Sequence, residues 1–308
     1  MNKLRVLVLM GGKSPEYKVS LISGRQVVSN LDKDKYQVSS FVIPQKGDFD
    51  FSSFKKLNPD IVFIAMHGPF GEDGSIQGML EFLGVPYVGA GVLASALGMN
   101  KIMFRKIIEK EGVPVPKYLV FGKNENPEKI LDIFEFPLVV KPSQQGSSIG
   151  VSIVDDKSSL ERSLKMAFEY DNPIIIEEFL SGQEITCGII GNDDYQILPL
   201  VEIKSKRRFF DYQAKYSEGE CEEIVPAKLP VEISEIVKKT ALKVYRSINC
   251  QVFGRVDLIL VDGVPYVLEI NTIPGLTPIS LLPKAALAAG LTYSQLLDVL
   301  IDYSFKKC

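Results

Sequence analysis

The first ninety residues alternate short apolar runs with segments of helical spacing, and this alternation is the strongest constraint on the fold. A crossover helix between two strands returns the chain parallel to itself, so repeated alternation builds a parallel sheet covered by helices. The sequence therefore predicts an α/β unit at the N-terminus. Its expected strands and helices are, in order, Leu4 to Leu9, Ser20 to Leu31, Val38 to Ile43, Asp60 to Met66 and Ser75 to Leu83.

The remaining two thirds of the chain are richer in predicted strands. At 308 residues the chain exceeds the size at which one hydrophobic core usually stops growing, so two or three domains are expected. Asn100 to Gly112 is predicted to form an amphipathic helix, and Val113 to Pro116 is a stiff connector that begins a second unit. The later predicted elements are Pro137 to Lys141, Val151 to Val154, Ser158 to Glu169, Ile174 to Glu178, Glu184 to Ile190, Gln196 to Ile203, Ile233 to Ile248, Gly254 to Val261 and Tyr266 to Asn271.

Composition narrows the range of partners and compartments. Lys and Arg number 35 against 38 Asp and Glu, a net charge of -3, and the one short basic cluster does not indicate a nucleic-acid partner. Four widely spaced cysteines and a single histidine argue against structural zinc. No apolar run approaches the ~20 residues of a membrane span, and Leu4 to Met10 is too short for a secretion signal. We expect a cytoplasmic protein without a membrane partner.

Two predicted strands near the C-terminus carry the strongest chemical signal. Strand side chains alternate between faces, so Arg255 and Asp257 share one face, and Glu269 and Asn271 share one face of the next strand. Carboxylate and amide oxygens suit magnesium, which binds a few carboxylates together with substrate phosphates, and an adjacent arginine can stabilise developing negative charge. The sequence favours a metal site here over the alternative, a surface hairpin with a salt bridge.

Convergence of the two carboxylates also restricts the turn between these strands. Directly opposed residues of an antiparallel pair point to the same face. A two-residue turn at Asp262 and Gly263 with regular pairing would set Asp257 opposite Leu268 and turn Glu269 to the other face. We therefore predict an odd loop, most simply Val261 to Gly263 with Gly263 in the left-handed region, or else a β-bulge within either strand.

A glycine- and serine-rich loop follows the predicted strand that ends at Lys141. Gly146, Ser147 and Ser148 are small enough for backbone N–H groups to close over phosphates beside the lysine. The chain contains neither a Walker A motif nor the dinucleotide fingerprint. A loop of this composition alone is more often an ordinary turn, but the lysine and the independent metal site favour a phosphate-binding lid.

The N-terminal sheet offers two further candidates at the carboxyl ends of its strands, where α/β folds bind ligands. Gly11 and Gly12 let the backbone approach a small molecule, and Glu16 can pair with an amino group. His67, the only histidine, ends a later strand ahead of a glycine-rich stretch. For both positions the alternative is a purely structural role.

Read together, these motifs resemble the D-alanine:D-alanine ligase family of the ATP-grasp superfamily over essentially the whole chain. The matching residues are Gly11, Gly12, Ser14, Glu16, Val19, Ser20, His67, Gly68, Gly71 to Gly74, Gln77, Gly78, Lys101, Lys141, Pro142, Gly146 to Ser148, Glu177, Glu184, Lys215, Tyr216, Gly254, Arg255, Asp257, Glu269, Asn271, Pro274, Gly275, Ser280 and Leu281. The resemblance implies an α/β fold, α+β in its ATP-grasp part, with a three-domain ATP-grasp architecture. The implied domains are a parallel α/β domain with the first D-alanine site (1–93), a central lid domain (94–180) and a C-terminal domain with the metal and second D-alanine sites (181–308).

By this resemblance ATP lies between the central and C-terminal domains. Lys101 and Lys141 would contact phosphates, Glu184 the ribose, and the strand that ends at Leu180 the adenine. Two Mg²⁺ ions, with Mn²⁺ as an alternative, would be held by Asp257, Glu269 and Asn271. The implied nucleotide-binding residues are Lys101, Lys141, Ser148, Glu177, Glu178, Leu180, Glu184 and Lys215.

The implied activity is ligation of two D-alanine molecules through D-alanyl phosphate, for peptidoglycan precursor synthesis. The resemblance sets the first D-alanine at Glu16, with Ser147 and Tyr216 in its hydrogen-bond set. The implied substrate-binding residues are Glu16, His67, Arg255, Ser280 and Leu281. Arg255 and the Gly275 N–H resemble an oxyanion hole, and Ser280 and Leu281 would meet the carboxylate of the second D-alanine. The implied catalytic residues are Glu16, Ser147, Tyr216, Arg255, Gly275 and Ser280.

Departures from the family bear on the hydrogen bonding around the first subsite. Many relatives carry acidic residues where Lys18, Asn100 and Gln145 stand here. Tyr216 favours D-alanine as the second substrate, because relatives that form the D-lactate ester resemble this chain but carry histidine there. The alternatives are an ATP-grasp carboxylate–amine ligase with another second substrate and a nucleotide-binding protein with an inactive site. The expected assembly is a homodimer.

Overall fold

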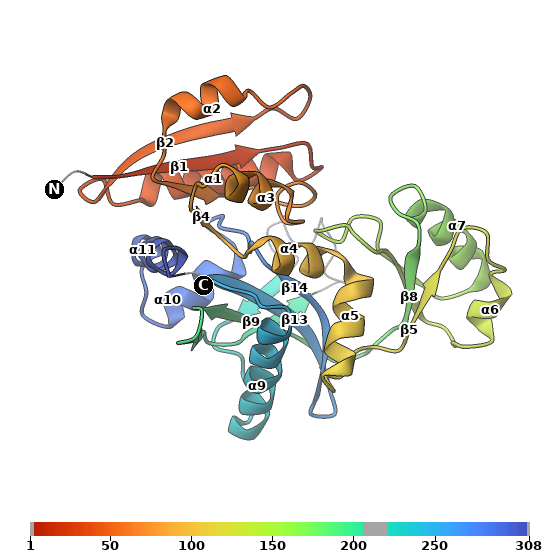
Figure 1. Ribbon diagram of the computed structural model, residues 1–308. Coiled ribbons are helices and arrows are strands. Elements are labelled where there is room, and N and C mark those ends of the chain that lie inside the picture. Colours follow the sequence, from red (N-terminus) through yellow and green to blue (C-terminus); the bar gives the residue numbers. More distant parts are fainter. Residues whose placement is uncertain (1–2, 206–220, 307–308) are drawn as a thin grey trace.

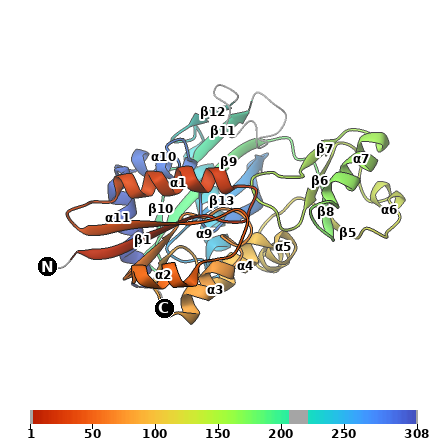
Figure 2. The ribbon, with the colours of Figure 1, turned by 90° about the horizontal axis from the view of Figure 1, so that it is seen from above.

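The computed structural model describes residues 3–205 and 221–306, which form three sheets. Figure 1 shows the N-terminal sheet, a small sheet at the far side of the molecule, and a larger sheet between them near the C-terminus. Figure 2, seen from above, separates the small sheet clearly from the other two. The described helices are all too short or too polar to cross a membrane.

The N-terminal sheet confirms the parallel α/β prediction. Its strand order is β2-β1-β3-β4, and every pairing in it is parallel. The central strand β1 is buried from Val6 to Leu9, as expected for a strand covered on both faces. The elements are β1 (Leu4–Gly11), α1 (Tyr17–Asn30), β2 (Tyr36–Ile43), α2 (Phe51–Leu57), β3 (Ile61–Ile64), α3 (Ser75–Phe82) and β4 (Tyr87–Val88).

Two helices lead from this sheet into the small antiparallel sheet, which has the order β5-β8-β6-β7. Its core is a separate cluster that includes Phe121, Leu138 and Ile176. Because this cluster is small and self-contained, the sheet is a unit of its own beside the rest of the molecule (Figure 1). The elements are α4 (Val92–Met99), α5 (Lys101–Lys110), β5 (Tyr118–Phe121), α6 (Glu128–Leu131), β6 (Leu138–Pro142), β7 (Ser152–Val154), α7 (Lys157–Ala167) and β8 (Ile174–Glu178).

The third sheet is antiparallel, with the order β12-β11-β9-β13-β14 and β10 paired to β9. Helix α11 packs against the N-terminal sheet, since Leu296 and Leu300 share a core cluster with Val6 and Val8. The elements are β9 (Gln183–Ile190), β10 (Gln196–Ile197), β11 (Val201–Ser205), β12 (Cys221–Ile224), α9 (Val231–Ser247), β13 (Phe253–Val261), β14 (Val264–Asn271), α10 (Leu281–Ala288) and α11 (Tyr293–Ser304).

One predicted strand is divided in the structure. The stretch from Gln196 to Ile203 was expected to be continuous, but β10 ends at Ile197 and β11 begins at Val201. Pro199 lies between the two strands. The break has a simple cause, because proline has no N–H to donate to a strand ladder.

The hairpin between β13 and β14 combines a two-residue turn with a bulge. Val261 pairs with Val264, so Asp262 and Gly263 form the turn, with φ of 49° and 81°. The three-residue loop predicted as the simplest solution is therefore wrong, because an Asp-Gly pair readily takes the two positive φ angles of a tight hairpin turn. The alternative prediction of a bulge is confirmed.

The bulge restores the register that the carboxylates need. The pairing shifts between Asp257 and Leu258, so that Asp257 lies opposite Glu269 while Leu258 lies opposite Val267. Leu268 is thus the extra residue on β14. One added residue moves Glu269 onto the face of Asp257, and the same register sets Arg255 opposite Asn271.

Candidate active site

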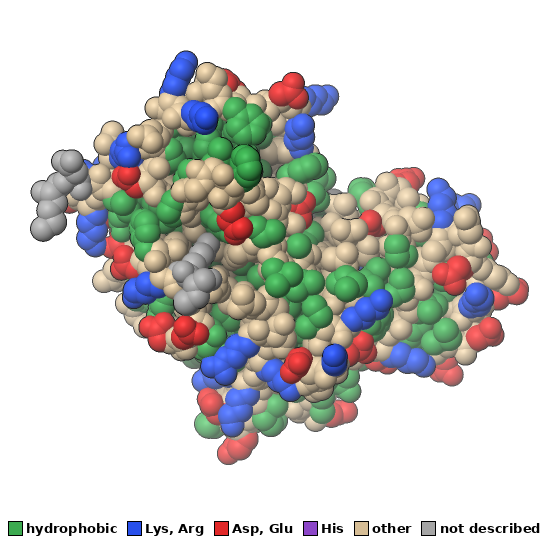
Figure 3. Space-filling model, viewed as in Figure 1, with side chains coloured by type: hydrophobic (Ala, Val, Ile, Leu, Met, Phe, Trp, Pro, Cys, Tyr) green, Lys and Arg blue, Asp and Glu red, His purple; other side chains and the backbone are tan. Residues whose placement is uncertain are grey.

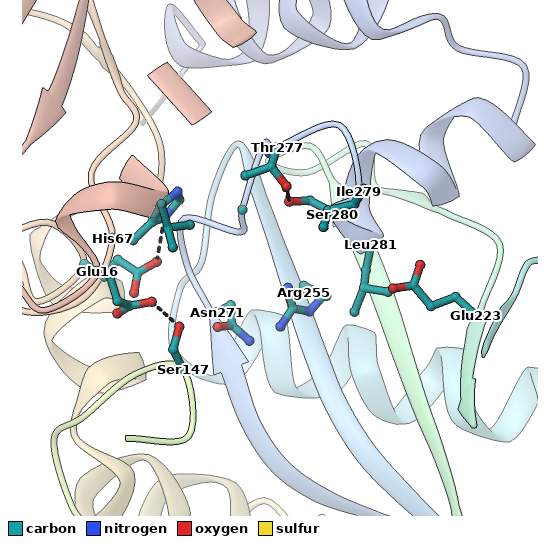
Figure 4. Close-up of a pocket in the computed structure, with 13 residues that line it drawn as sticks. Glu16, His67, Ser147, Glu223, Arg255, Asn271, Thr277, Ile279, Ser280 and Leu281 are labelled. Carbon is teal, nitrogen blue, oxygen red and sulfur yellow. Dashed lines mark hydrogen bonds and ion pairs between the residues drawn. The ribbon is translucent and has the colours of Figure 1, made fainter. Parts of the chain in front are cut away.

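Two adjoining pockets collect most of the residues singled out from the sequence. The substrate pocket, as we call the first, lies where the N-terminal sheet, the loop after β6 and the large sheet meet (Figure 4). The nucleotide pocket, as we call the second, lies between the two antiparallel sheets. The residues that line the substrate pocket are Glu16, Val19, His67, Glu72, Ser147, Glu223, Arg255, Asn271, Gly275, Thr277, Ile279, Ser280 and Leu281.

Glu16 and Ser147 meet in the substrate pocket although 131 positions separate them. Glu16 is the N-cap residue of α1 and is 5% exposed, and its carboxylate accepts a hydrogen bond from the Ser147 hydroxyl (Figure 4). The loop reaches it because Gly146 has no side chain: a Cβ there would lie 2.7 Å from Glu16 Oε2. Gly146, which the sequence predicts to lie in a phosphate-binding loop, thus also allows Ser147 to contact Glu16 of the N-terminal domain.

His67 is held between a hydroxyl and a carboxylate. Its Nε2 lies 2.8 Å from the Ser23 hydroxyl, and its Nδ1 lies 3.6 Å from Glu72 Oε1. Burial lowers the pKa of His67, but the hydrogen bond and charge of Glu72, with the charge of Glu16, outweigh it and raise the pKa above its usual value. The two carboxylates therefore favour the protonated form of His67 more than burial alone would allow. Glu72 was not proposed as a site residue, although the glycine-rich stretch around it was part of the family signal.

Arg255 and Asp257 form a two-contact ion pair at the floor of the site. Arg255 Nε and Nη2 lie 2.8 and 2.7 Å from the two Asp257 oxygens. The hydroxyl of Thr186 and the amide nitrogen of Asn271 also donate to Asp257, at 2.6 and 3.0 Å. Burial disfavours the charged guanidinium, but Asp257 more than offsets this and raises the pKa of Arg255. The arginine is a fixed positive charge facing the substrate pocket (Figure 4).

Gly275 and Ser280 lie close together at the opposite wall. Ser280 is the N-cap residue of α10, and its Oγ accepts a hydrogen bond of 3.0 Å from the Thr277 N–H. A Cβ at Gly275 would lie 2.9 Å from that oxygen, so the close approach requires glycine. Leu281 follows in the first turn of the helix. The structure thus gathers Arg255, Gly275, Ser280 and Leu281 around one pocket.

Glu223 is a pocket residue that sequence reasoning missed. It lies on the edge strand β12 and lines the substrate pocket near Leu281 (Figure 4). Its carboxylate pairs with Lys284 of α10. No motif marks either residue. An acidic strand residue and a helical lysine 61 positions apart have a role only once the strand and the helix are packed together.

The nucleotide pocket combines apolar walls with buried lysines. Apolar side chains from both antiparallel sheets, such as Val139, Leu180 and Ile259, form its walls. Ser148 lines it from the loop after β6. The complete lining is Lys101, Pro116, Val139, Lys141, Gln145, Ser148, Val151, Glu177, Glu178, Phe179, Leu180, Glu184, Asp257, Ile259, Leu268 and Glu269.

Each buried lysine of this pocket has a carboxylate partner. Lys141 Nζ lies 2.8 Å from Glu177 Oε1, and Lys101 Nζ lies 3.2 Å from Glu269 Oε2. Lys101 also donates to the Gln145 carbonyl at 2.7 Å. Burial lowers the pKa of Lys141 to about 8, although Glu177 partly opposes this. The ammonium groups converge on a largely apolar space, which suits a polyanion attached to a flat apolar ring.

The candidate metal residues lie on one face of the β13–β14 hairpin. Asp257 and Glu269 are directly opposed, and Asn271 points its amide nitrogen at Asp257, so the amide oxygen is left as its remaining ligand atom. The described residues contain no group of three or more His, Cys, Asp or Glu arranged for a metal ion. Two carboxylates with an amide are a donor set that suits a cation shared with phosphate oxygens.

Three of the predicted site residues are not seen to point into either pocket. Glu178 lines the nucleotide pocket, but its carboxylate accepts a hydrogen bond of 2.7 Å from the Lys117 N–H, at the edge of the small sheet. Lys215 and Tyr216 lie outside the described residues. The sequence hypothesis for those two residues therefore stays a prediction.

The departures at Asn100 and Lys18 have little consequence for the local structure. The Asn100 side chain caps α5 by accepting a hydrogen bond of 3.0 Å from the Met103 N–H, a role that asparagine and aspartate fill equally well. Lys18 is exposed on α1. At Gln145 it is the backbone carbonyl that contacts Lys101, and this contact does not depend on the side chain.

This fold, with a nucleotide pocket between two antiparallel sheets, defines the ATP-grasp class. Family models for D-Ala–D-Ala ligase match the chain at the N-terminus over residues 5–58 and 50–90, and at the C-terminus over residues 107–302. The D-alanine–D-alanine ligase of Bacillus anthracis is 43% identical over 305 residues, which cover 98% of each chain. That of Carboxydothermus hydrogenoformans is 41% identical, covering 97% of each chain.

Solved structures agree with the sequence comparison. The Bacillus anthracis ligase complexed with ATP superimposes with a TM-score of 0.87 at 41% identity, covering 99% of this chain and 98% of the other. A D-Ala:D-Ser ligase from Enterococcus faecalis superimposes with a TM-score of 0.85 at 31% identity, covering 98% and 100%. The chain belongs to the D-alanine–D-alanine ligase family.

Proposed function

We propose that this protein joins two D-alanine molecules at the expense of ATP, through D-alanyl phosphate, and so supplies a precursor of peptidoglycan. The observation that carries the proposal is the junction of the two pockets at the β13–β14 hairpin. Arg255 and Asn271 face the substrate pocket, whereas Asp257 and Glu269 face the nucleotide pocket. Because these four residues share one face of the hairpin, a phosphoryl group held in the nucleotide pocket is within reach of a carboxylate held in the adjoining substrate pocket.

In this proposal the nucleotide pocket binds ATP with its phosphates toward the lysines. Lys141 and Lys101 offset phosphate charge in a buried setting, where electrostatic interactions are stronger than in water. The strand end at Glu178 to Leu180 supports the adenine, and Glu184 the ribose. The loop at Ser148 covers the site, which excludes water from the reactive acyl phosphate.

The donor atoms at the hairpin fit magnesium. Asp257 and Glu269 are directly opposed, and the amide nitrogen of Asn271 is turned to Asp257, so two carboxylates and one amide oxygen lie on one face of the hairpin where the two pockets meet. Bound there, Mg²⁺ or Mn²⁺ would neutralise charge on the transferring phosphoryl group. Lys101 holds Glu269 in place and supplies positive charge at the same position.

The substrate pocket provides for both amino acids. Glu16, held by Ser147, pairs with the ammonium group of the first D-alanine, and His67 stabilises the surrounding carboxylates. Arg255 and the Gly275 N–H stabilise the tetrahedral oxyanion that forms when the second amine attacks the acyl phosphate. Ser280 and the N-terminus of α10, beside Leu281, receive the carboxylate of the second D-alanine.

A different second substrate is the competing proposal. The Enterococcus faecalis relative is a D-Ala:D-Ser ligase with the same fold, and the superposition covers 98% of this chain and 100% of that one. D-Serine differs from D-alanine by one hydroxyl, which a pocket built for a methyl group excludes only weakly. The presence of tyrosine at position 216 supports D-alanine over D-lactate, and the assay with D-serine decides between D-alanine and D-serine.

Location, assembly and domain limits complete the proposal. We place the protein in the cytoplasm, with domains at 1–93, 94–180 and 181–308. A homodimer is supported by an apolar surface on α2 and α3, where Phe51 and Phe82 are 52% and 91% exposed. On the face shown in Figure 3, apolar side chains gather over the N-terminal part of the molecule.

An ADP-release assay tests the proposal directly. The full chain with ATP and Mg²⁺ is expected to release ADP on addition of D-alanine and to form the dipeptide, detected by mass spectrometry. L-Alanine, D-serine and D-lactate serve as alternative substrates, alone and with D-alanine. Equal ADP release without any amino acid would reject ligation, and a preference for D-serine as the second substrate would select the competing proposal.

A further inference from the structure

A fully buried arginine lies behind the nucleotide pocket. Arg105 belongs to α5, is 0% exposed and does not line the pocket. Its neighbours on the buried face of the helix include the apolar Phe104 and Ile108. An apolar residue would serve packing at this position better, because a buried guanidinium must recover its lost hydration through several polar contacts.

Three of the residues that Arg105 contacts, Glu177, Leu268 and Pro116, line the nucleotide pocket. Its Nη2 lies 2.7 Å from Glu177 Oε1, the same oxygen that Lys141 Nζ approaches at 2.8 Å. Nη2 also donates to the Leu268 carbonyl and Nη1 to the Pro116 carbonyl, each at 3.4 Å. The guanidinium lies 5.3 Å from the centre of the Tyr118 ring.

Two of these partners determine the geometry of the site. Glu177 is the carboxylate that holds Lys141, and Leu268 is the bulge residue that brings Glu269 opposite Asp257. Arg105 thus contacts both the small sheet, through Glu177, and the large sheet, through Leu268. These are the two sheets between which the nucleotide pocket lies.

Arg105 also changes the net charge beside the nucleotide pocket. Glu177 carries one negative charge and is shared by two buried cations, so the group Arg105, Lys141 and Glu177 has a net charge of +1. Without Arg105, Glu177 would neutralise Lys141 alone. With it, the three side chains together keep a net positive charge that an incoming phosphate can offset.

We propose that Arg105 is a positioning residue for ATP: it holds Glu177 between the two sheets and thereby directs Lys141 to the phosphates and the Glu177 carboxylate to the base. The inference rests on the proposed ATP-dependent function. A fixed carboxylate favours a base with an exocyclic amine in that place, as in adenine, over one with a carbonyl, as in guanine. Arg105 therefore contributes to base selection without touching the nucleotide.

The experiment compares Arg105→Met and Arg105→Lys with Lys106→Met, which removes an exposed charge from the next position of the same helix. For each full-length variant, KM for ATP and for GTP, KM for D-alanine and kcat are measured, and ADP binding is measured by calorimetry without D-alanine. For Arg105→Met we expect KM for ATP to rise about tenfold or more, as for loss of a hydrogen-bonded charge. The ATP-to-GTP preference should fall, whereas KM for D-alanine should stay within about twofold.

Arg105→Lys keeps the positive charge, but its single ammonium group cannot contact Glu177 and both carbonyls at once as the guanidinium does. We therefore expect a rise in KM for ATP that is smaller than in Arg105→Met. If Arg105→Met does not fold, Arg105→Lys alone tests the positioning role of Arg105. An unchanged KM for ATP with an unchanged base preference in Arg105→Lys, or equal losses for ATP and D-alanine, would overturn the proposal. Failure of the unsubstituted protein to bind ADP would instead reject the proposed function.

Discussion

The nucleotide and substrate pockets differ in how they are assembled. The nucleotide pocket is framed by neighbouring strands of two antiparallel sheets, and its buried lysines are each paired with a carboxylate. The substrate pocket is formed by loop and helix ends from three separate parts of the chain, and its contacts, such as that of Ser147 with Glu16, cross between them. The strands that frame the first are held by regular pairing within each sheet, although the pocket itself forms only where the two sheets pack together. The second takes its residues from loop and helix ends and depends on packing throughout.

This difference predicts which parameter each substitution changes. Variants in the nucleotide pocket should act on ATP, variants in the substrate pocket should act on D-alanine, and variants of the hairpin shared by both pockets should act on the chemical step. The predictions below break or sharpen that division, beginning with the hairpin.

Glu269→Gln should have the largest effect. It removes a proposed magnesium ligand and the partner of Lys101 while conserving volume. We expect kcat to fall by about 10³ or more, since several kcal/mol of transition-state charge stabilisation are lost. The fold should be retained, as checked by an unchanged melting temperature, with the exposed Glu232→Gln as the control. Activity within a few-fold of the unsubstituted protein would refute the metal assignment.

Arg255→Ala should rank second. It removes the fixed charge facing the proposed oxyanion, and kcat should fall by roughly 10² to 10³, the usual cost of one oxyanion donor. Steady-state kinetics with saturating ATP separate the effects. A rise in KM for D-alanine with unchanged kcat would show that Arg255 binds substrate and does not stabilise the transition state. The same result would mean that Arg255, although on the shared hairpin, acts only in binding D-alanine.

The pH dependence of ATP use should report Lys141. Burial lowers its pKa to about 8, so the ammonium is charged below that pH and loses its proton as the pH rises through it. We expect kcat/KM for ATP to fall by up to about tenfold for each unit above pH 8, because only the charged lysine offsets phosphate charge. Lys141→Arg, which stays charged, should remove this descending limb. A descending limb that persists in Lys141→Arg would assign the titration to another group.

Breaking the pair between Glu223 and Lys284 should have the smallest effect. The two side chains are 18% and 37% exposed, and such pairs contribute about 0–1 kcal/mol, so Glu223→Gln should raise KM for D-alanine by no more than about fivefold. The charge-reversed double variant Glu223→Lys, Lys284→Glu should recover part of the loss. KM for ATP should not change. A larger change for ATP than for D-alanine would contradict the division between the two pockets.

The sequence by itself determined the elements and the polar groups that strand alternation brings together. Alternating apolar runs predicted the parallel N-terminal sheet, and period-2 alternation put Arg255 with Asp257 and Glu269 with Asn271. These are local properties, because strand geometry follows from backbone sterics alone. The number of residues between Asp257 and Glu269 also predicted either an odd loop or a β-bulge in the hairpin, but it did not say where a bulge would lie.

Tertiary structure decided the rest. The bulge falls at Leu268, and not in the turn, because Asp262 and Gly263 suit a tight turn. The contacts of Glu16 with Ser147, of Glu223 with Lys284, and of Arg105 with Glu177 join residues 61 to 131 positions apart. Such pairs leave no periodicity in the sequence. Their geometry is determined by the way the three sheets pack, since only packing brings distant charges close enough to interact strongly.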